Sequence, residues 1–496
     1  MSRRQRHMVG YRIFFVIVIP TMYFLYVSTA ALIGNDVKAV SGQGGRMRKL
    51  LQIEPGVENE ANCTKPAITE FPPDGLTRSQ RQSGYIAIHV VLALYLFLLL
   101  AIVCDDFFVP AIKKICEKLN VTEDVAGATV MAVASSSPEL FVNIVGTFVT
   151  EGDLGVGTIV GSAVFNILAV PACCGLFAKQ VLTLEWWPIT RDSLAYAYTV
   201  ILLIITLRDG QIEWYEALIL VFSYILYISA MCFNRRINRF MQWARLSKRR
   251  YKSFCETMPL IPNNCFKELD AQSIELSKLE SQEIVDLTCW PESKWEKLWW
   301  VITWPINFVL LITIPDCRRY SLRKWYLLTF IMCIVWIAGT SYIVGWVITI
   351  IGDTFMVPDS IMGLTFLAAG MSVPEAVSSV IVTNQGHGGM GISNSIGSNV
   401  FDVLLCLGLP WFVKAAFYPT TPGEYSVKIN SQGLVYSSVS LFSTLMILYI
   451  SLASNKFKLS KTVGIACLVT YTIFLVLASL VELNIFFTVN LPTCDH

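Results

Sequence analysis

The chain has 496 residues, of which 54% are apolar and only 15% are charged, and its mean hydropathy is +0.56. Ordinary soluble domains carry about 25% charged residues, so this composition excludes a soluble globule and indicates a polytopic membrane protein. The formal net charge of +2 gives no sign of nucleic-acid binding, and we expect none.

The N-terminal residues 1–34 are predicted to be a signal peptide or a membrane anchor, because arginines precede a long apolar run there. Under either alternative, residues 35–84 form an extracytosolic segment, which we call the head. Asn62 lies in this head within an Asn-Cys-Thr sequon, which makes it a candidate glycosylation site.

A first set of five apolar segments follows, each near the ~20 residues that span a hydrocarbon core. They cover about 85–104, 125–150, 154–176, 191–207 and 213–233, within a first five-helix repeat at residues 85–233. Eight Lys and Arg residues between positions 235 and 252 predict a cytosolic loop over residues 234–324.

Within this loop, residues 298–315 are apolar but contain Pro305 and have basic residues on both sides, which predicts an interfacial or re-entrant segment. A second five-helix repeat at residues 325–482 then begins inside, and residues 483–496 form an extracytosolic tail. Its segments cover about 326–351, 359–384, 391–417, 433–453 and 461–482.

One stretch occurs in both sets. Residues 127–168 align without a gap to residues 363–404, at a constant offset of 236, and 14 of the 42 pairs are identical. Because the two sets start on opposite sides of the membrane, this is an inverted-topology repeat, typical of secondary transporters. We therefore expect an all-α polytopic membrane protein with ten core transmembrane helices in two inverted five-helix repeats.

Each copy carries a Ser-x-Pro-Glu sequence inside an apolar run. Ser135 and Ser136 share a helix face with Glu139, and Ser372 occupies the matching position beside Glu375. Proline disrupts the bond to the carbonyl four residues earlier. The carbonyls freed in this way are those of Ala134 and Gly370.

The second part of each copy adds further oxygen atoms. Ser162 lies four residues before Asn166, and Ser398 lies four residues before Asp402. Carboxylates, hydroxyls and carbonyls without nitrogen or sulfur ligands suit hard cations such as Ca²⁺, and by the same reasoning Na⁺ and K⁺. An unpaired carboxylate at the bilayer centre costs at least about 2.5 kcal/mol, so Glu139, Glu375 and Asp402 predict a cation site.

Simpler explanations apply to the neighbouring residues. A membrane proline is often a kink, and spaced glycines often serve helix packing. Asp105 and Asp106 are placed at a membrane edge, in contact with solvent. Asp153 is explained as a helix cap, and His89 as a hydrogen-bonded core residue.

The residues alone leave other classes of function open. A cation channel can use the same oxygen atoms, although an inverted repeat favours alternating access. An enzyme is not expected, because the chain lacks a Gly-x-Gly-Asp pair and a His-Glu-x-x-His sequence and has four histidines in all. No cofactor is expected.

The motifs resemble those of the potassium-dependent sodium/calcium exchangers. They are Ser135-Ser-Ser-Pro-Glu-Leu140, Gly152-Asp-Leu-Gly-Val-Gly-Thr-Ile-Val-Gly-Ser-Ala-Val-Phe-Asn166, Met371-Ser-Val-Pro-Glu375 and Ser393-Asn-Ser-Ile-Gly-Ser-Asn-Val-Phe-Asp402. Within that family, Ala172-Cys-Cys-Gly175 and Trp411-Phe-Val-Lys414 look closest to the fifth vertebrate member.

The resemblance implies an antiporter that exchanges Ca²⁺ and K⁺ for Na⁺. It implies that Glu139 and Glu375 bind Ca²⁺ and Na⁺ in competition, and that Asp402, where potassium-independent exchangers have Asn, binds K⁺. The remaining ligands that it implies are Ser136, Ser162, Asn166, Ser372, Ser398 and Asn399. A potassium-independent exchanger and a transport-impaired regulatory homologue are the alternatives within this family.

Two further expectations follow from the resemblance. Met371 replaces a Thr of the family pattern, and a thioether is a poor ligand for hard cations, so we expect lower cation affinity or altered selectivity. The expected location is the plasma membrane, with an organelle membrane such as that of the trans-Golgi as the alternative.

Overall fold

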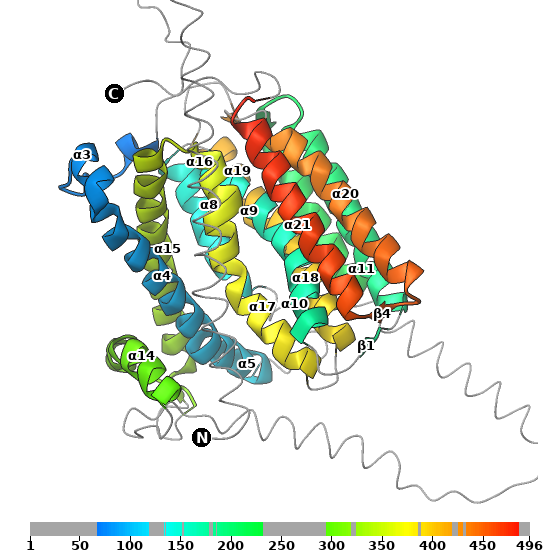
Figure 1. Cartoon of the computed structure of the whole chain (residues 1–496), viewed down its shortest axis with the longest axis horizontal. Coiled ribbons are helices and arrows are strands. Elements are labelled where there is room, and N and C mark those ends of the chain that lie inside the picture. Colours follow the sequence, from blue (N-terminus) through cyan, green and yellow to red (C-terminus); the bar gives the residue numbers. More distant parts are fainter. Residues whose placement is uncertain are drawn as a thin grey trace, which may run out of the picture.

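The computed structural model describes most of the membrane region. Its described residues are 67–118, 133, 135–150, 153–177, 182–184, 186–231, 294–318, 324–384, 388–418, 425–429 and 433–485. Within them, nine helices are long and apolar enough to cross a membrane, and they pack into one bundle (Figure 1). This confirms the predicted all-α polytopic fold. The sequon at Asn62 and the signal or anchor segment lie outside the described residues.

The first half of the chain contributes four of these spans within the described residues. The first, Arg78–Ile115, follows the short η2 (Ala67–Glu70) and combines α3 (Arg78–Gln80), η3 (Arg81–Tyr85), α4 (Ile86–Ile102), η4 (Val103–Phe108) and the start of α5 (Val109–Lys118). Next come α8 (Ser137–Phe148) and then the span Leu154–Phe177, made of α9 (Leu154–Val164), η6 (Phe165–Ala169) and α10 (Val170–Phe177). After β1 (Leu182–Thr183), α11 (Trp186–Leu207) and β2 (Gln211–Glu213) comes the span Trp214–Met231.

The first span corrects the prediction for this region. The sequence predicted a helix over residues 85–104 with Asp105 and Asp106 at the membrane edge, but the helix continues to Ile115 and contains both. The two aspartates lower the local hydropathy, which made the sequence look like a helix end. They lie in the π-helical turn η4 next to buried Phe107 and Phe108, so packing continues past them.

The predicted segment 125–150 is represented by α8, because residues 119–132 and 134 lie outside the described residues.

The second half contains α14 (Lys294–Thr313), α15 (Tyr326–Phe355), α16 (Asp359–Met362), η8 (Gly363–Leu367), α17 (Ala368–Asn384), α18 (Gly388–Phe401), η9 (Asp402–Leu407), α19 (Gly408–Phe417), β3 (Ser426–Lys428), α20 (Gly433–Ser454), β4 (Lys458–Leu459) and α21 (Lys461–Glu482). Its five spans lie at the predicted places.

Two small antiparallel sheets connect the halves. β1 pairs with β4, and β2 pairs with β3. β1 precedes α11 and β2 follows it, whereas β3 precedes α20 and β4 follows it. The packed helices α11 and α20 therefore run in opposite directions between the same two sheets, as an inverted repeat requires.

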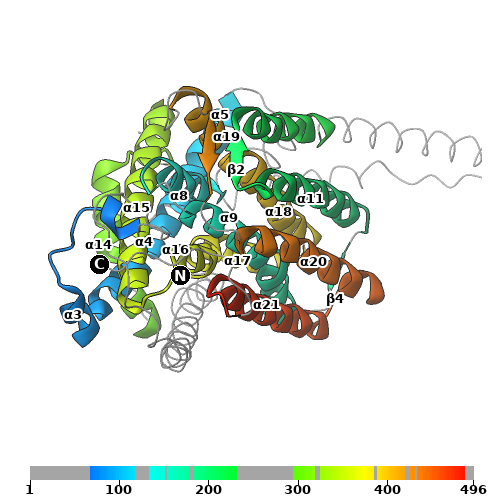
Figure 2. The ribbon, with the colours of Figure 1, turned by 90° about the horizontal axis from the view of Figure 1, so that it is seen from above.

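The most buried span is Leu154–Phe177, with 94% of its most apolar stretch buried, against 22% for Trp214–Met231. It lies at the centre of the bundle when the molecule is seen from above (Figure 2). Glycines allow this centre to form: Gly161 lies against the carbonyl of Leu364, and Gly363 lies against the carbonyl of Leu154. A side chain at either glycine would overlap the facing backbone, so α9 and η8 cross at close range.

The helix α14 is not one of the membrane-spanning candidates among the described residues. It is one continuous helix despite Pro305. Figure 1 looks almost along α14 while the spans run across the picture, so α14 lies crosswise to them. Its end is held by α15, because Trp336 Nε1 donates to Thr313 Oγ1 at 3.0 Å.

The described part of the predicted head packs on the end of α15 that precedes α16. Arg81 makes an ion pair with Asp353 at 2.9 Å, and Trp346 Nε1 donates to the carbonyl of Pro72 at 2.9 Å. His89 is buried, and its Nε2 lies 3.4 Å from a carboxylate oxygen of Asp74. This confirms the predicted core position of His89, and its predicted hydrogen bond stays a prediction.

Candidate functional site

The two Ser-x-Pro-Glu sequences adopt different local structures. In the first copy, Ser136 is the non-helical residue before α8, and Pro138 lies in the first turn. Proline fits there because the backbone N–H groups of a first turn have no helical partner. In the second copy, α17 continues through Pro374.

The carbonyls predicted to be freed by these prolines are not both described. Ala134 lies outside the described residues. Gly370 is buried within α17 and packs against the ring of Phe97, where any side chain would overlap that ring. The described geometry therefore gives Gly370 a packing contact in addition to its predicted role.

Glu375 is the centre of a network that joins the two repeats. Its Oε2 accepts hydrogen bonds from Asn166 Nδ2 at 2.5 Å and from Ser398 Oγ at 3.4 Å, and the hydroxyl of Ser135 also interacts with this carboxylate. Asn166 Nδ2 donates in addition to Asn399 Oδ1 at 3.1 Å. Four predicted residues are thus brought together around Glu375.

Hydrogen bonds from side chains to backbone carbonyls also join these helices. Ser395 Oγ donates to the carbonyl of Asn166 at 2.8 Å, and Asn399 Nδ2 donates to the carbonyl of Ala163 at 3.2 Å. Asn166 and Asp402 each lie at the start of a π-helical turn, η6 or η9. Such turns often occur at functional sites.

Asp402 lies near α8. Cys406 Sγ lies 3.9 Å from Asp402 Oδ1 and 3.8 Å from the carbonyl of Ser136, and Asn143 Nδ2 donates to the carbonyl of Cys406 at 2.5 Å. The carboxylate of Asp402 is close enough to those of Glu139 and Glu375 to be repelled by both. The three acidic residues thus act on one another electrostatically within one buried region, which is the candidate site.

This site is buried but not internally satisfied. Glu139 and Asp402 are each 1% exposed, and Glu375 is 3% exposed. Several buried oxygen atoms accept or donate no hydrogen bond among the described residues: Ser136 Oγ, Glu139 Oε2, Asn166 Oδ1, Ser372 Oγ, Glu375 Oε1 and Asp402 Oδ2. Buried polar atoms are nearly always paired in native proteins, so these atoms are suited to a cation or water.

Two of the predicted ligands have simpler surroundings. Ser162 is fully buried, but its Oγ donates to the carbonyl of Ile159 in its own helix at 3.0 Å. Ser372 is also fully buried, on the same helix as Glu375. Neither has a described hydrogen bond to a carboxylate.

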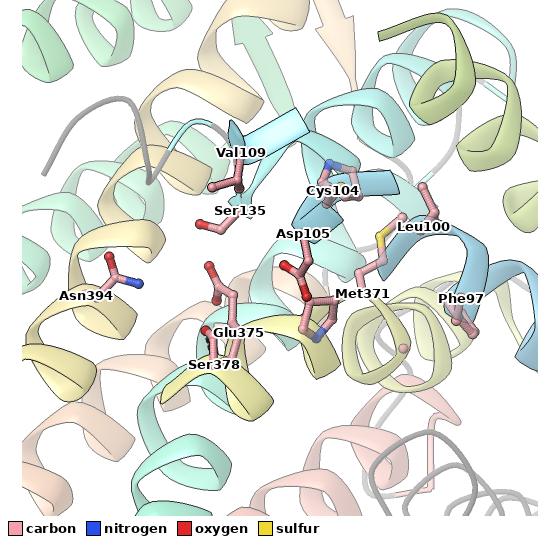
Figure 3. A pocket seen from close by; sticks show the side chains of 13 residues that line it. Phe97, Leu100, Cys104, Asp105, Val109, Ser135, Met371, Glu375, Ser378 and Asn394 are labelled. Carbon is pink, nitrogen blue, oxygen red and sulfur yellow. Dashed lines mark hydrogen bonds between the residues drawn. The ribbon is translucent and has the colours of Figure 1, made fainter. Parts of the chain in front are cut away.

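A cavity of about 140 Å³ reaches Glu375 from one side. Figure 3 shows the side chains of Ser135, Asp105 and Glu375 directed into it from the segment before α8, from η4 and from α17. Met371 also lines it and is 3% exposed, so a thioether faces this space where the family pattern has a hydroxyl.

Some of these residues were missed by the sequence interpretation. Asp105 was assigned to solvent, and neither Cys406 nor Ser395 was singled out. Asn143 lies four residues after Glu139, but its bond to Cys406 depends on a helix 263 positions away. The sequence signal for these residues was weak, because each of them is a single polar side chain within an apolar stretch.

No group of three Asp, Glu, His or Cys side chains is close enough to hold one metal ion within the described residues. A cation at this site would therefore take many of its ligands from hydroxyl, amide and carbonyl oxygens. Such neutral oxygen ligands, with a few carboxylates, suit Ca²⁺, Na⁺ and K⁺ better than transition metals.

Comparison with known proteins gives the family. The model of the family described as "Sodium/calcium exchanger protein" matches residues 89–233 and 325–480. Human sodium/potassium/calcium exchanger 4 is 36% identical over 99% of this chain and 97% of its own length. Human sodium/potassium/calcium exchanger 5 is also 36% identical, over 86% of this chain and 90% of its own.

The comparison therefore does not single out the fifth member that the sequence motifs favoured, since the fourth matches at the same identity over more of the chain. Among solved structures, the sodium-calcium exchanger NCX_Mj is 18% identical, with a TM-score of 0.43 over 78% of this chain and 97% of its own. The family match covers both halves of the membrane region. This multi-pass membrane protein belongs to the sodium/calcium exchanger family and is similar in sequence to sodium/potassium/calcium exchangers.

Proposed function

We propose that this protein is an antiporter that moves Ca²⁺ together with K⁺ in one direction and Na⁺ in the other. The observation that carries this proposal is the set of unpaired, fully buried oxygen atoms around Glu139, Glu375 and Asp402, at the meeting point of the two inverted repeats. The names of the relatives, sodium/potassium/calcium exchangers, supply the identity of the ions.

Glu139 and Glu375 are the proposed ligands for which Ca²⁺ and Na⁺ compete. Their charges repel one another, which makes the empty site unfavourable and favours the entry of cations. The proposed neutral ligands are Ser135, Ser136, Ser162, Ser372, Ser398, Asn166 and Asn399, with the backbone carbonyls of Ala134 and Gly370.

Asp402 is the proposed K⁺ ligand. It occupies the position of Asn166 in the other repeat, and that asparagine donates a hydrogen bond to Glu375. An ionised aspartate has no hydrogen to donate. Its side chain is therefore available to a cation, and Asp402 Oδ2 has no hydrogen-bond partner among the described residues.

The cavity suggests the side from which ions reach the site. Val109 lies in the last part of the first span, Ser378 in the last part of α17 and Asn394 in the first part of α18. In the proposed topology, these three helix ends face the cytosol. This conformation therefore corresponds to access from the cytosolic side, and exchange requires a second conformation that opens Glu375 to the other side.

The proposed topology keeps the predicted boundaries. Residues 1–34 form a signal peptide or anchor, 35–84 and 483–496 are extracytosolic, and 234–324 are cytosolic, with Asn62 as a glycosylation site. The proposed location is the plasma membrane, and an organelle membrane such as the trans-Golgi is the alternative. Lipid and the three ions are the proposed partners.

The test is ion flux in sealed vesicles that contain the purified protein. We expect Ca²⁺ uptake driven by an outward Na⁺ gradient, which is lost when K⁺ is removed. Asp402→Asn should remove the K⁺ dependence. A K⁺ response that survives this substitution would contradict the role of Asp402, and single-channel currents in place of coupled flux would contradict antiport.

A further inference from the structure

A buried tyrosine outside the repeated stretch lies near Asp402. Tyr196 is near the middle of the 22-residue helix α11 and is fully buried. Helix α11 packs against both α18 and the π-helical turn η9, which begins with Asp402. The phenol group of Tyr196 and the carboxylate of Asp402 interact electrostatically.

The hydroxyl of Tyr196 accepts and donates no hydrogen bond among the described residues. A buried tyrosine hydroxyl usually finds a partner, because leaving it unpaired carries the full cost of removing it from water. Asp402 Oδ2 is unpaired in the same way. Two packed elements, α11 and η9, thus each carry a buried oxygen atom without a hydrogen-bond partner among the described residues.

Aromatic and sulfur groups lie beside Asp402. Tyr224, from the span Trp214–Met231, packs against Phe401 with 5.5 Å between the ring centroids, and Cys406 Sγ lies 3.9 Å from Asp402 Oδ1. The charged group that acts on the phenol of Tyr196 is the carboxylate of Asp402. A cation bound at Asp402 would supply the missing partner to both oxygen atoms, since a phenol oxygen is a neutral hard ligand.

We propose that the hydroxyl of Tyr196 is a ligand of the monovalent cation held by Asp402, and that it sets the affinity of the exchanger for K⁺. This inference rests on the proposed function, since it assigns an additional ligand to the same site. It adds a residue of α11, whereas all the ligands proposed above come from the two repeated stretches.

The test is Tyr196→Phe, which removes one oxygen atom and keeps the ring. We expect the K⁺ concentration for half-maximal Ca²⁺ uptake to rise between about twofold and tenfold, the effect of losing one neutral polar contact. The half-saturating concentrations of Ca²⁺ and Na⁺ should stay as in the unchanged protein. The matched control is Tyr227→Phe, because Tyr227 lies near Arg191 and Asp192 and its substitution should leave K⁺ affinity unchanged.

A second measurement does not depend on transport. K⁺ added to the purified protein should raise its melting temperature, and this rise should be smaller in Tyr196→Phe, while the rise caused by Ca²⁺ is retained. Retention of the Ca²⁺ response shows that the variant is folded. An unchanged K⁺ response, or an equal loss of the K⁺ and Ca²⁺ responses, overturns the proposal.

The double variant Tyr196→Phe with Asp402→Asn separates this inference from the proposed function. If Asp402→Asn alone abolishes the K⁺ response, the second substitution should change nothing further. If Asp402→Asn acts as expected and Tyr196→Phe has no effect, the assignment of Tyr196 is wrong and that of Asp402 stands. If Asp402→Asn leaves the K⁺ response intact, the proposed function itself fails.

Discussion

The two repeated stretches share 14 of 42 residues, yet they contribute different chemistry to the site. The first copy supplies Asn166, whose amide donates to Glu375 and Asn399, whereas the second copy supplies Asp402 at the equivalent position. The first copy therefore stabilises the carboxylate of Glu375 through Asn166, and the second copy adds the carboxylate of Asp402. The comparison teaches that a shared backbone arrangement does not imply shared roles for equivalent side chains.

The contacts between helices differ in the same way. Asn143 of α8 donates to the carbonyl of Cys406, but the equivalent Ser379 of α17 donates to the carbonyl of Gly391 in the adjacent α18 at 3.5 Å. The buried Lys414 of α19 adds a second hydrogen bond to α8, with Nζ donating to the carbonyl of Thr147 at 2.6 Å. Lys414 lies beyond the repeated stretch, and the offset of 236 places an alanine, Ala178, at the corresponding position of the first half.

The largest expected effect comes from neutralising the acids that the two copies have in common. Glu139→Gln and Glu375→Gln should each weaken the apparent Ca²⁺ affinity by about tenfold to a hundredfold, because each loses a contact to a charged group. Ca²⁺ uptake into vesicles measures this. Ser229→Ala is the control, since Ser229 is exposed, donates to a backbone carbonyl and does not line the cavity. Full flux in Glu139→Gln would remove that residue from the site.

Exchanging the residues that distinguish the copies comes next in size. Asn166→Asp removes the donor to Glu375 and adds a carboxylate beside it, so we expect uptake to fall by at least about tenfold. Adding Asp402→Asn restores the number of carboxylates but not the hydrogen bond to Glu375. We therefore expect the double variant to remain impaired. Recovery of normal K⁺-dependent flux would show that the two positions are interchangeable.

A smaller effect should follow from removing Lys414, which has an alanine at the corresponding position of the first half. Lys414→Met leaves the last carbonyls of α8 without a cation, which we expect to cost about 1.5 to 3 kcal/mol of unfolding free energy. Thermal unfolding in detergent measures the change, and Lys414→Gln should recover part of it because it keeps a donor. If Lys414→Met and the unchanged protein are equally stable, the hydrogen bond from Lys414 to the carbonyl of Thr147 does not contribute to stability.

The smallest effect is expected for Met371→Thr, which places a hydroxyl in the cavity beside Glu375. One added neutral ligand should strengthen the apparent cation affinity by about twofold to fivefold. Measurement of flux against Na⁺ and Ca²⁺ concentration tests this. If neither dependence changes, the thioether of Met371 does not limit affinity.

Much of this arrangement could be predicted from the sequence, because hydropathy and repetition depend on many residues at once. The spans of the second half and the grouping of Ser398, Asn399 and Asn166 around Glu375 follow from such patterns. The length of the first helix could not be predicted, because its continuation past Asp105 depends on tertiary packing. Nor could the contact between Asn143 and Cys406, which depends on how two distant helices cross.

The two small sheets at the ends of α11 and α20 have a mechanical consequence. The segments that flank α11 and α20 pair at both ends of the two helices, so the pair forms a closed frame, and tilting or sliding one helix alone would have to break backbone hydrogen bonds of a sheet. A change of access that spares this frame must be carried by helices outside it. Loosening one corner, for example with a proline at Ile212 in β2, should therefore disturb the rate of turnover more than the strength of ion binding.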